Sequence, residues 1–210
     1  MPTLTLYGTP VSTYVRTVRL LLAETDTTYD LKEVGIFNGD NTTDAYLSKQ
    51  PFGKVPVLAV DGQEIYETGA ITEYLNAAVA NENYQPSDLW LRTRMRQIIS
   101  IIDSYLYAPA IGTVVIQRLI VPQQGGESDE SAVKEAVAPT QKALGAIEGL
   151  IVGSPFLLGD SLSLADLYLI PIFVYLSKTP EFGALTAQTP QLKAWWENAQ
   201  ILDSVKQVCA

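Results

Sequence analysis

Strand-like and helix-like patterns divide unevenly along this chain, and that division constrains the fold more than any other feature. Residues 3–66 alternate period-two segments with helical ones, whereas every long segment of the remainder has helical periodicity. The stretch 80–88 is polar and contains Pro86, which is typical of a linker. With 210 residues, the chain has room for two modest domains. We therefore predict an α/β domain over residues 1–79 and an all-helical domain over residues 89–210.

The first domain is predicted to have the element order βαβαββα. Strand patterns cover Thr3–Tyr7, Thr28–Val34, Val55–Val60 and Gln63–Tyr66, and helical patterns follow Pro10, surround Tyr46 and cover Thr68–Ala78. Asp61-Gly62 separates the last two strands, as expected for a tight hairpin turn. In the second domain, helices are predicted at 89–120, 129–152, 163–177 and 190–200.

The composition excludes several kinds of chemistry. Histidine is absent and Cys209 is the only cysteine, so Ser-His-Asp and Cys-His mechanisms, intrachain disulfides and thiolate metal sites are excluded. We expect no metal. The net charge is −9 and the densest basic group, Arg92, Arg94 and Arg96, is scattered around a helix, so no nucleic-acid partner is expected. No signal sequence or membrane-length apolar run is recognised, which favours a cytoplasmic protein without a membrane partner.

A proline inside an apolar strand is the most specific local feature of the chain. It lies in Pro51-Phe52-Gly53-Lys54-Val55-Pro56-Val57-Leu58. Because proline cannot donate a hydrogen bond to a neighbouring strand, it belongs at the edge of a sheet. Pro56 could simply end the sheet there, or the edge could be kept open for a ligand that pairs with the backbone.

Together with Ser12 after the first strand and Glu67-Thr68 after the hairpin, this segment resembles the thioredoxin-like domain of glutathione transferases. The resemblance covers the whole chain, and the serine-type theta-like or phi-like classes are most similar, with the cyanobacterial chi class more loosely so. It implies a detoxification enzyme that joins the thiolate of glutathione to small hydrophobic electrophiles. Glutathione is then a co-substrate, and no cofactor is implied.

The resemblance also implies how the ends of glutathione are held. In that family the Val55–Pro56 bond is cis, and the main chain of Val55 pairs with the cysteinyl backbone. Glu67 and Thr68 match the pair that holds the γ-glutamyl carboxylate at a helix N-terminus, which favours anions. Thr68 could instead be only the N-cap of that helix.

Two further residues match positions at the glycine end of glutathione. Lys54 occupies one of them, with a solvated loop lysine as the alternative reading. Asn41 lies in the loop where theta-like and phi-like members often have histidine.

Ser12 is the predicted activator of the thiol. The segment from Thr9 to Arg16 resembles the serine-type signature, with Arg four residues after Ser. A free thiol has a pKa of about 8.5, so a hydroxyl donor and a helix N-terminus would be needed to stabilise the thiolate at neutral pH. The alternatives are that Ser12 is only a helix cap, and that Tyr7, at the end of the first strand, is the donor rather than a core aromatic.

Residues of the second domain are expected to serve the electrophile or the fold. The electrophile pocket is predicted to be lined by Tyr7 and the loop after it, together with Tyr105, Tyr107 and Ile111. For any one of these apolar and aromatic residues taken alone, core packing is the better explanation. Ser163 and Asp166 resemble the family's capping box, a folding role.

The fold and the thiolate chemistry each leave an alternative function open. The same fold serves as a non-catalytic interaction or ligand-binding module in other proteins, and the same thiolate could drive isomerase, dehalogenase or peroxidase chemistry. Apolar surface on the helices that flank the linker favours a homodimer.

Overall fold

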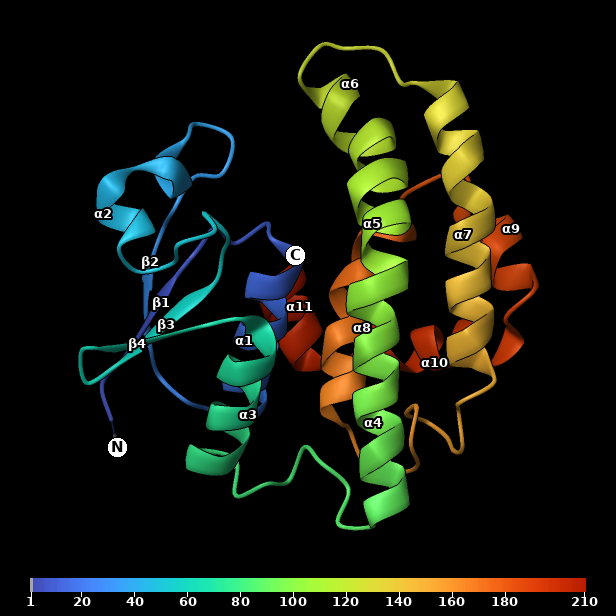
Figure 1. Ribbon diagram of the computed structural model, residues 1–210. Coiled ribbons are helices and arrows are strands. Elements are labelled where there is room, and N and C mark those ends of the chain that lie inside the picture. Colours follow the sequence, from blue (N-terminus) through green and yellow to red (C-terminus); the bar gives the residue numbers. More distant parts are fainter. Residues whose placement is uncertain (1) are drawn as a thin grey trace. The chain divides into compact units, whose positions relative to one another are not determined.

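The computed structural model describes residues 2–210, which fold into two compact units (Figure 1). The first unit comprises the chain up to Asn83 together with Asp203–Ala210, and the second comprises Tyr84–Leu202. The prediction of a helical domain reaching residue 210 is therefore wrong at its end. Helix α11 (Asp203–Cys209) packs against the first helix of the first unit, because its apolar face, including Val205 and Val208, is buried there.

The first unit is built on a mixed four-stranded sheet, which confirms the thioredoxin-like prediction. The strands are β1 (Leu4–Tyr7), β2 (Asp30–Lys32), β3 (Val57–Val60) and β4 (Gln63–Tyr66), in the order β2-β1-β3-β4. The pair β1–β2 is parallel, and β1–β3 and β3–β4 are antiparallel. Asp61 and Gly62 both have positive φ, at 48° and 86°, as a type I′ hairpin turn requires.

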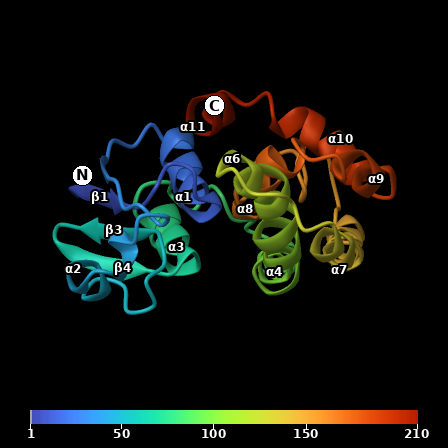
Figure 2. The same cartoon turned by 90° about the horizontal axis from the view of Figure 1, so that it is seen from above.

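Helices cover both faces of this sheet. They are α1 (Thr13–Glu24), η1 (Asp40–Thr42), α2 (Asp44–Leu47) and α3 (Thr68–Ala78). Helices α1 and α3 pack together on one face, and α2 lies on the other, as both views show (Figures 1 and 2). On the α2 side, Val34, Tyr46 and Val57 form a small core with the half-buried Tyr7 and Val55.

The second unit is entirely helical. Its helices are α4 (Leu89–Ile101), α5 (Tyr107–Pro109), α6 (Val121–Gln123), α7 (Glu130–Glu148), α8 (Leu164–Leu176), α9 (Phe182–Ala187) and α10 (Pro190–Ala199). Every residue of α8 except Tyr175 is buried, so this helix forms the centre of the unit's core. The ring of Phe173 on α8 has edge contacts with those of Phe182 and Trp195.

The helix predicted at 89–120 contains π-helical segments that the sequence pattern did not reveal. Residues η2 (Ile102–Leu106) and η3 (Ala110–Ile120) are π-helical, and they join α4, α5 and α6 into one continuous stretch. Its most apolar 18-residue window has a mean hydropathy of 1.5, which by length and composition would suffice to cross a membrane. Buried residues such as Met95, Ile98 and Ile102 instead place one side of it in the core of the unit.

The predicted capping box is confirmed at the start of α8. Ser163 is the N-cap, and the Asp166 carboxylate accepts hydrogen bonds from the Ser163 N–H at 2.9 Å and from its hydroxyl at 2.6 Å. The same carboxylate also accepts from the Leu157 N–H at 2.9 Å and the Trp195 indole N–H at 2.8 Å. Asp166 is fully buried, and it therefore joins three segments of the helical unit.

Candidate functional site

The loop before Pro56 is held in place by a buried glutamine. The side-chain oxygen of Gln50 accepts hydrogen bonds from the N–H groups of Phe52 at 2.7 Å and Lys54 at 3.0 Å. Gln50 is 1% exposed. Because a buried polar group is costly without partners, these bonds fix both the glutamine and the loop. Gln50 is not recognisable as a functional residue from the sequence, since only its position before Pro51 could draw attention to it.

The carbonyl groups of the same loop are held by α2 and η1. The Tyr46 hydroxyl donates to the Lys54 carbonyl at 2.6 Å, and Asn41 Nδ2 donates to the Gly53 carbonyl at 2.8 Å. Burial raises the pKa of Tyr46 to about 12, which keeps its hydroxyl protonated as a donor. Asn41 and Lys54, both predicted at the glycine end, are thus brought to one loop, with the Lys54 side chain exposed.

Val55 lies just outside the sheet and next to a cis peptide bond. The Val55–Pro56 bond is cis, as predicted. Strand β3 begins at Val57, so the predicted strand 55–60 started too early, as expected of a segment in which proline cannot join the ladder. Within the described residues, neither the N–H nor the C=O of Val55 has a hydrogen-bond partner. A half-buried residue with an unpaired backbone presents a place where an extended peptide could pair.

Ser12 occupies the N-cap position of α1, but its side chain does not cap the helix. Its N–H donates to the Thr9 carbonyl at 3.1 Å, and its own carbonyl accepts from the Arg16 N–H at 2.9 Å. Within the described part of the chain, its hydroxyl makes no capping hydrogen bond. The backbone of Ser12 is therefore committed to the turn, while its half-buried hydroxyl remains available at a helix N-terminus.

Glu67 and Thr68, the pair predicted to hold the γ-glutamyl carboxylate, lie at the N-terminus of α3. Glu67, not Thr68, is the N-cap, and Thr68 is the first helical residue, so the cap alternative for Thr68 is wrong. Glu67 is exposed and has a φ of 70°. Residues other than glycine adopt this backbone region only at an energetic cost. Such outliers concentrate at functional sites, and this one lies directly before the first turn of α3, whose leading N–H groups have no partner within the helix.

The four residues predicted near the electrophile are divided between the units. Tyr7 ends β1, where it packs half-buried beneath Lys49, whose Nζ lies 5.2 Å from the ring centroid. Tyr105, Tyr107 and Ile111 lie on the π-helical stretch of the second unit. Tyr105 is 67% exposed, whereas Ile111 is 8% exposed and belongs largely to the core of that unit.

Comparisons with known proteins agree with this arrangement over both units. Residues 6–83 match the family model for the glutathione S-transferase N-terminal domain, and residues 97–200 match the model for the C-terminal domain. Glutathione S-transferase F13 of Arabidopsis thaliana is 32% identical over 92% of this chain and 89% of its own length. Glutathione S-transferase 1 of Zea mays is 29% identical over 100% of this chain and 97% of its own.

Solved structures have the same fold. The crystal structure of glutathione transferase F7 from Populus trichocarpa has a TM-score of 0.85 and 31% identity, covering 98% of this chain and 97% of that one. Glutathione S-transferase I from maize, solved with an atrazine glutathione conjugate, has a TM-score of 0.83 and 26% identity, covering 99% and 96%.

The fold and the first unit's loops define a thioredoxin-like protein with an added helical unit. The chain belongs to the glutathione S-transferase family, it is an enzyme of that activity, and its relatives F13 and F7 are phi-class members.

Proposed function

We propose that Ser12 activates glutathione by donating its hydroxyl hydrogen bond to the sulfur, which stabilises the thiolate. The observation that carries this role is the Ser12 side chain at the N-terminus of α1 with no capping bond to make. The hydroxyl and the positive end of the helix dipole both favour the charged sulfur over the thiol. Tyr7 is the weaker candidate, because its ring packs in the small core on the α2 side of the sheet.

Binding of the tripeptide follows from the loops around Ser12. The unpaired N–H and C=O of Val55, next to Pro56, suit the cysteinyl backbone of glutathione, as in the addition of a strand. The N-terminus of α3, with Thr68 and the outlier Glu67, suits the γ-glutamyl carboxylate.

The glycine end is assigned to the loop that Gln50 holds. The exposed ammonium of Lys54 offers a charge partner for the glycine carboxylate. Asn41 already donates its Nδ2 to the Gly53 carbonyl, so we assign it to shaping this loop as well as lining it. Glutathione is the co-substrate of the reaction, and thiolate stabilisation together with orientation supplies the chemistry without a further cofactor.

The second substrate is proposed to be a small hydrophobic electrophile, which fits a detoxification role in the cytoplasm. The maize relative was solved in complex with an atrazine glutathione conjugate. Tyr105 and Tyr107, from the second unit, remain our assignment for contact with such a substrate, and Ile111 contributes from its edge of the core.

A panel of electrophiles tests this function. We expect the protein to accelerate conjugation of glutathione to at least one aryl halide or isothiocyanate, since these need only a positioned thiolate. If the protein turns over only hydroperoxides, or only catalyses an isomerisation, it is a peroxidase or an isomerase instead. Failure on every compound, with glutathione still bound in calorimetry, would contradict the proposal.

We also propose a homodimer assembled through the helices that flank the linker. Leu89 and Trp90, at the start of α4, are 69% and 66% exposed, a combination that favours burial against a second copy. Sedimentation at micromolar concentration is expected to give twice the chain mass of 22.9 kDa. Trp90→Glu should shift the protein toward monomer, whereas Ile201→Glu, at a residue 63% exposed elsewhere in the same unit, should not. A monomeric wild type would contradict the assembly.

A further inference from the structure

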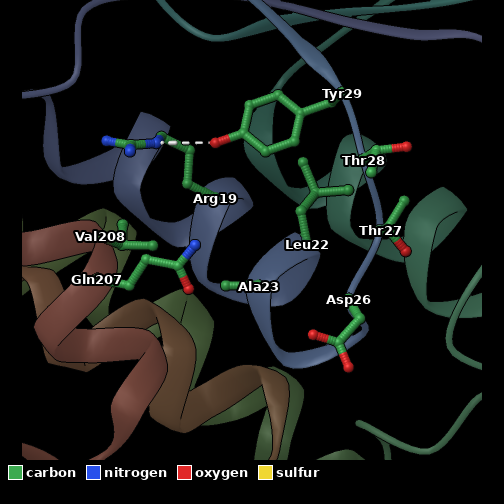
Figure 3. Close-up of a pocket in the computed structure, with 9 residues that line it drawn as sticks. All are labelled: Arg19, Leu22, Ala23, Asp26, Thr27, Thr28, Tyr29, Gln207 and Val208. Carbon is green, nitrogen blue, oxygen red and sulfur yellow. Dashed lines mark hydrogen bonds between the residues drawn. The ribbon is translucent and has the colours of Figure 1, made fainter.

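A pocket lies in the first unit, toward the C-terminal end of α1 and away from the Ser12 end of that helix. It has a volume of about 340 Å³ and opens between the C-terminal part of α1, the turn that leads into β2, and α11 (Figure 3). The volume falls in the range of small-molecule sites. Arg19 is separated from Ser12 by about two helical turns, or ~10 Å along the axis of α1. The pocket therefore shares no residue with the proposed glutathione site.

One end of the pocket presents hydrogen-bond donors. Arg19 Nε donates to the Tyr29 hydroxyl at 3.0 Å, and Figure 3 shows the two side chains meeting there. Because the Tyr29 oxygen accepts this bond, its own proton is left to donate, and the neighbouring charge strengthens it as a donor. Within the described residues Arg19 has no carboxylate partner. A half-buried guanidinium without a counter-ion, beside a hydroxyl donor, matches the geometry of a carboxylate.

The wall of the pocket is already fixed without a ligand. The Thr25 hydroxyl donates to the Leu21 carbonyl at 3.0 Å and lies 2.8 Å from the Thr27 hydroxyl. The Thr27 N–H donates to the Leu22 carbonyl at 2.9 Å. A wall held by its own hydrogen bonds costs a ligand little ordering entropy, which favours binding.

The rest of the pocket restricts which other groups a ligand with a carboxylate can carry. Ala23 supplies apolar contact between the ends of the pocket, and the buried side chains of Leu22 and Val208 lie behind this surface. Asp26 lies at the end opposite Arg19 and Tyr29 in Figure 3, and it has no side-chain partner within the described residues. This carboxylate repels a second negative group on a ligand and accepts a hydrogen bond from a hydroxyl there.

We propose that this pocket binds a small monocarboxylate with a flat apolar body and a hydroxyl at its far end, that is, a hydroxyaryl carboxylic acid. The carboxylate pairs with Arg19 and Tyr29, the ring lies on the apolar middle, and the hydroxyl donates to Asp26. Binding there is independent of glutathione conjugation, because none of these residues belongs to the proposed catalytic set.

Calorimetric titration with 4-hydroxyphenylacetate tests the site. The protein is first saturated with S-hexylglutathione, so that the proposed glutathione site cannot contribute. We expect one binding event in the wild type, weakened about tenfold or more by Arg19→Gln and about threefold or more by Tyr29→Phe, as expected for charged and neutral donors. Lys178→Gln removes the same charge from an exposed position of the second unit and should leave the affinity unchanged.

The far end is tested by a pair of ligands. Phenylacetate lacks the hydroxyl and should bind the wild type more weakly than 4-hydroxyphenylacetate. Asp26→Asn should narrow that difference while allowing a dianion, terephthalate, to bind. Asparagine tolerates the φ of 49° that Asp26 adopts, so this variant keeps the turn.

Conjugating activity distinguishes the site from the proposed function. All variants should keep wild-type turnover with glutathione, and this also reports that they fold. Absence of binding by the saturated wild type at millimolar ligand would overturn the proposal. So would equal affinities in Arg19→Gln, Tyr29→Phe and Lys178→Gln. If Arg19→Gln loses activity through misfolding, the comparison of Tyr29→Phe with Lys178→Gln decides.

Discussion

Replacement of Asp166 by alanine is expected to lower the free energy of unfolding of the helical unit by about 3–5 kcal/mol, in the range of broken buried charge networks. The Asp166 carboxylate is fully buried and accepts four hydrogen bonds, two on each oxygen. Alanine leaves the Leu157 and Ser163 N–H groups and the Trp195 indole N–H without an acceptor. Each unpaired buried donor carries a desolvation cost of about 1–3 kcal/mol, although these costs are not additive.

Urea unfolding followed by tryptophan fluorescence measures this loss, because Trp195 and Trp196 lie buried in the same unit. Asp160→Ala provides the matched control, since Asp160 is exposed and a change there should stay within about 0.5 kcal/mol. Asp166→Asn should also destabilise the helical unit. Both oxygens of Asp166 accept hydrogen bonds, and the NH₂ group of asparagine would replace one of them with a donor that faces other donors. Equal midpoints for Asp166→Ala and Asp160→Ala would show that the network carries no stability.

The pH dependence of that difference has a definite sign. Burial raises the pKa of Asp166, and the four donors offset this only in part. A folded-state pKa above the unfolded value means that the native protein holds the proton more tightly. The stability from this group is therefore fully present below the unfolded pKa of about 3.9 and declines as pH rises through the raised folded pKa. The difference in the free energy of unfolding between wild type and Asp166→Ala should therefore become smaller as pH rises from the unfolded pKa through the folded pKa.

Local patterns account for most of the elements that could be predicted. Helix α3 was predicted with its observed limits, Thr68–Ala78, and the hairpin at Asp61-Gly62 followed from turn chemistry. The capping box at Ser163 was equally local. In each case, residues that determine the structure are close in sequence, so period and dipeptide identity carry the information.

Contacts between distant segments could not be predicted. Helix α11 packs against α1 although the residues of the second unit separate the two helices in sequence. Helix α9 is too short for its period to be recognised. The π-helical segments preserve an apolar helix pattern, so the sequence indicated one α-helix there. These features depend on packing partners that a periodic pattern does not identify.

The hydrogen bonds that support the candidate site could not be predicted from the sequence. Resemblance assigned Ser12, Val55 and Glu67 to glutathione binding, and these assignments stay predictions, whereas the cis bond at Pro56 is as expected. It gave no indication that Gln50 would be buried and hold two N–H groups, because a glutamine in a polar stretch reads as exposed. Nor could it determine whether the Ser12 hydroxyl caps α1, which depends on the rotamer rather than the residue type.

Turnover is expected to fall ~10-fold or more in Ser12→Ala, as for loss of a donor whose hydrogen bond strengthens when negative charge develops on the substrate. The affinity for glutathione should change little, because the proposed contacts of Val55, Thr68 and Lys54 do not involve the hydroxyl. The pKa of the bound thiol should rise toward its free value of about 8.5.

Stability separates this role from a structural one. An N-cap side chain replaced by alanine costs about 1 kcal/mol, but the Ser12 hydroxyl makes no capping bond, so the unfolding free energy of Ser12→Ala should stay close to wild type. A loss of stability with turnover preserved would mean that Ser12 caps α1 in solution and does not act on the sulfur.

A titration of thiolate absorbance in wild type, Ser12→Ala and Tyr7→Phe identifies the donor. Only the residue that donates to the sulfur should shift the titration to higher pH when it is replaced, because the other variant leaves the thiolate's hydrogen bond intact. Tyr7→Phe retains the ring that packs with Val57 and Tyr46, and it therefore removes the hydroxyl without disturbing the small core. If Tyr7→Phe shifts the curve and Ser12→Ala does not, the catalytic donor is Tyr7, at the end of β1.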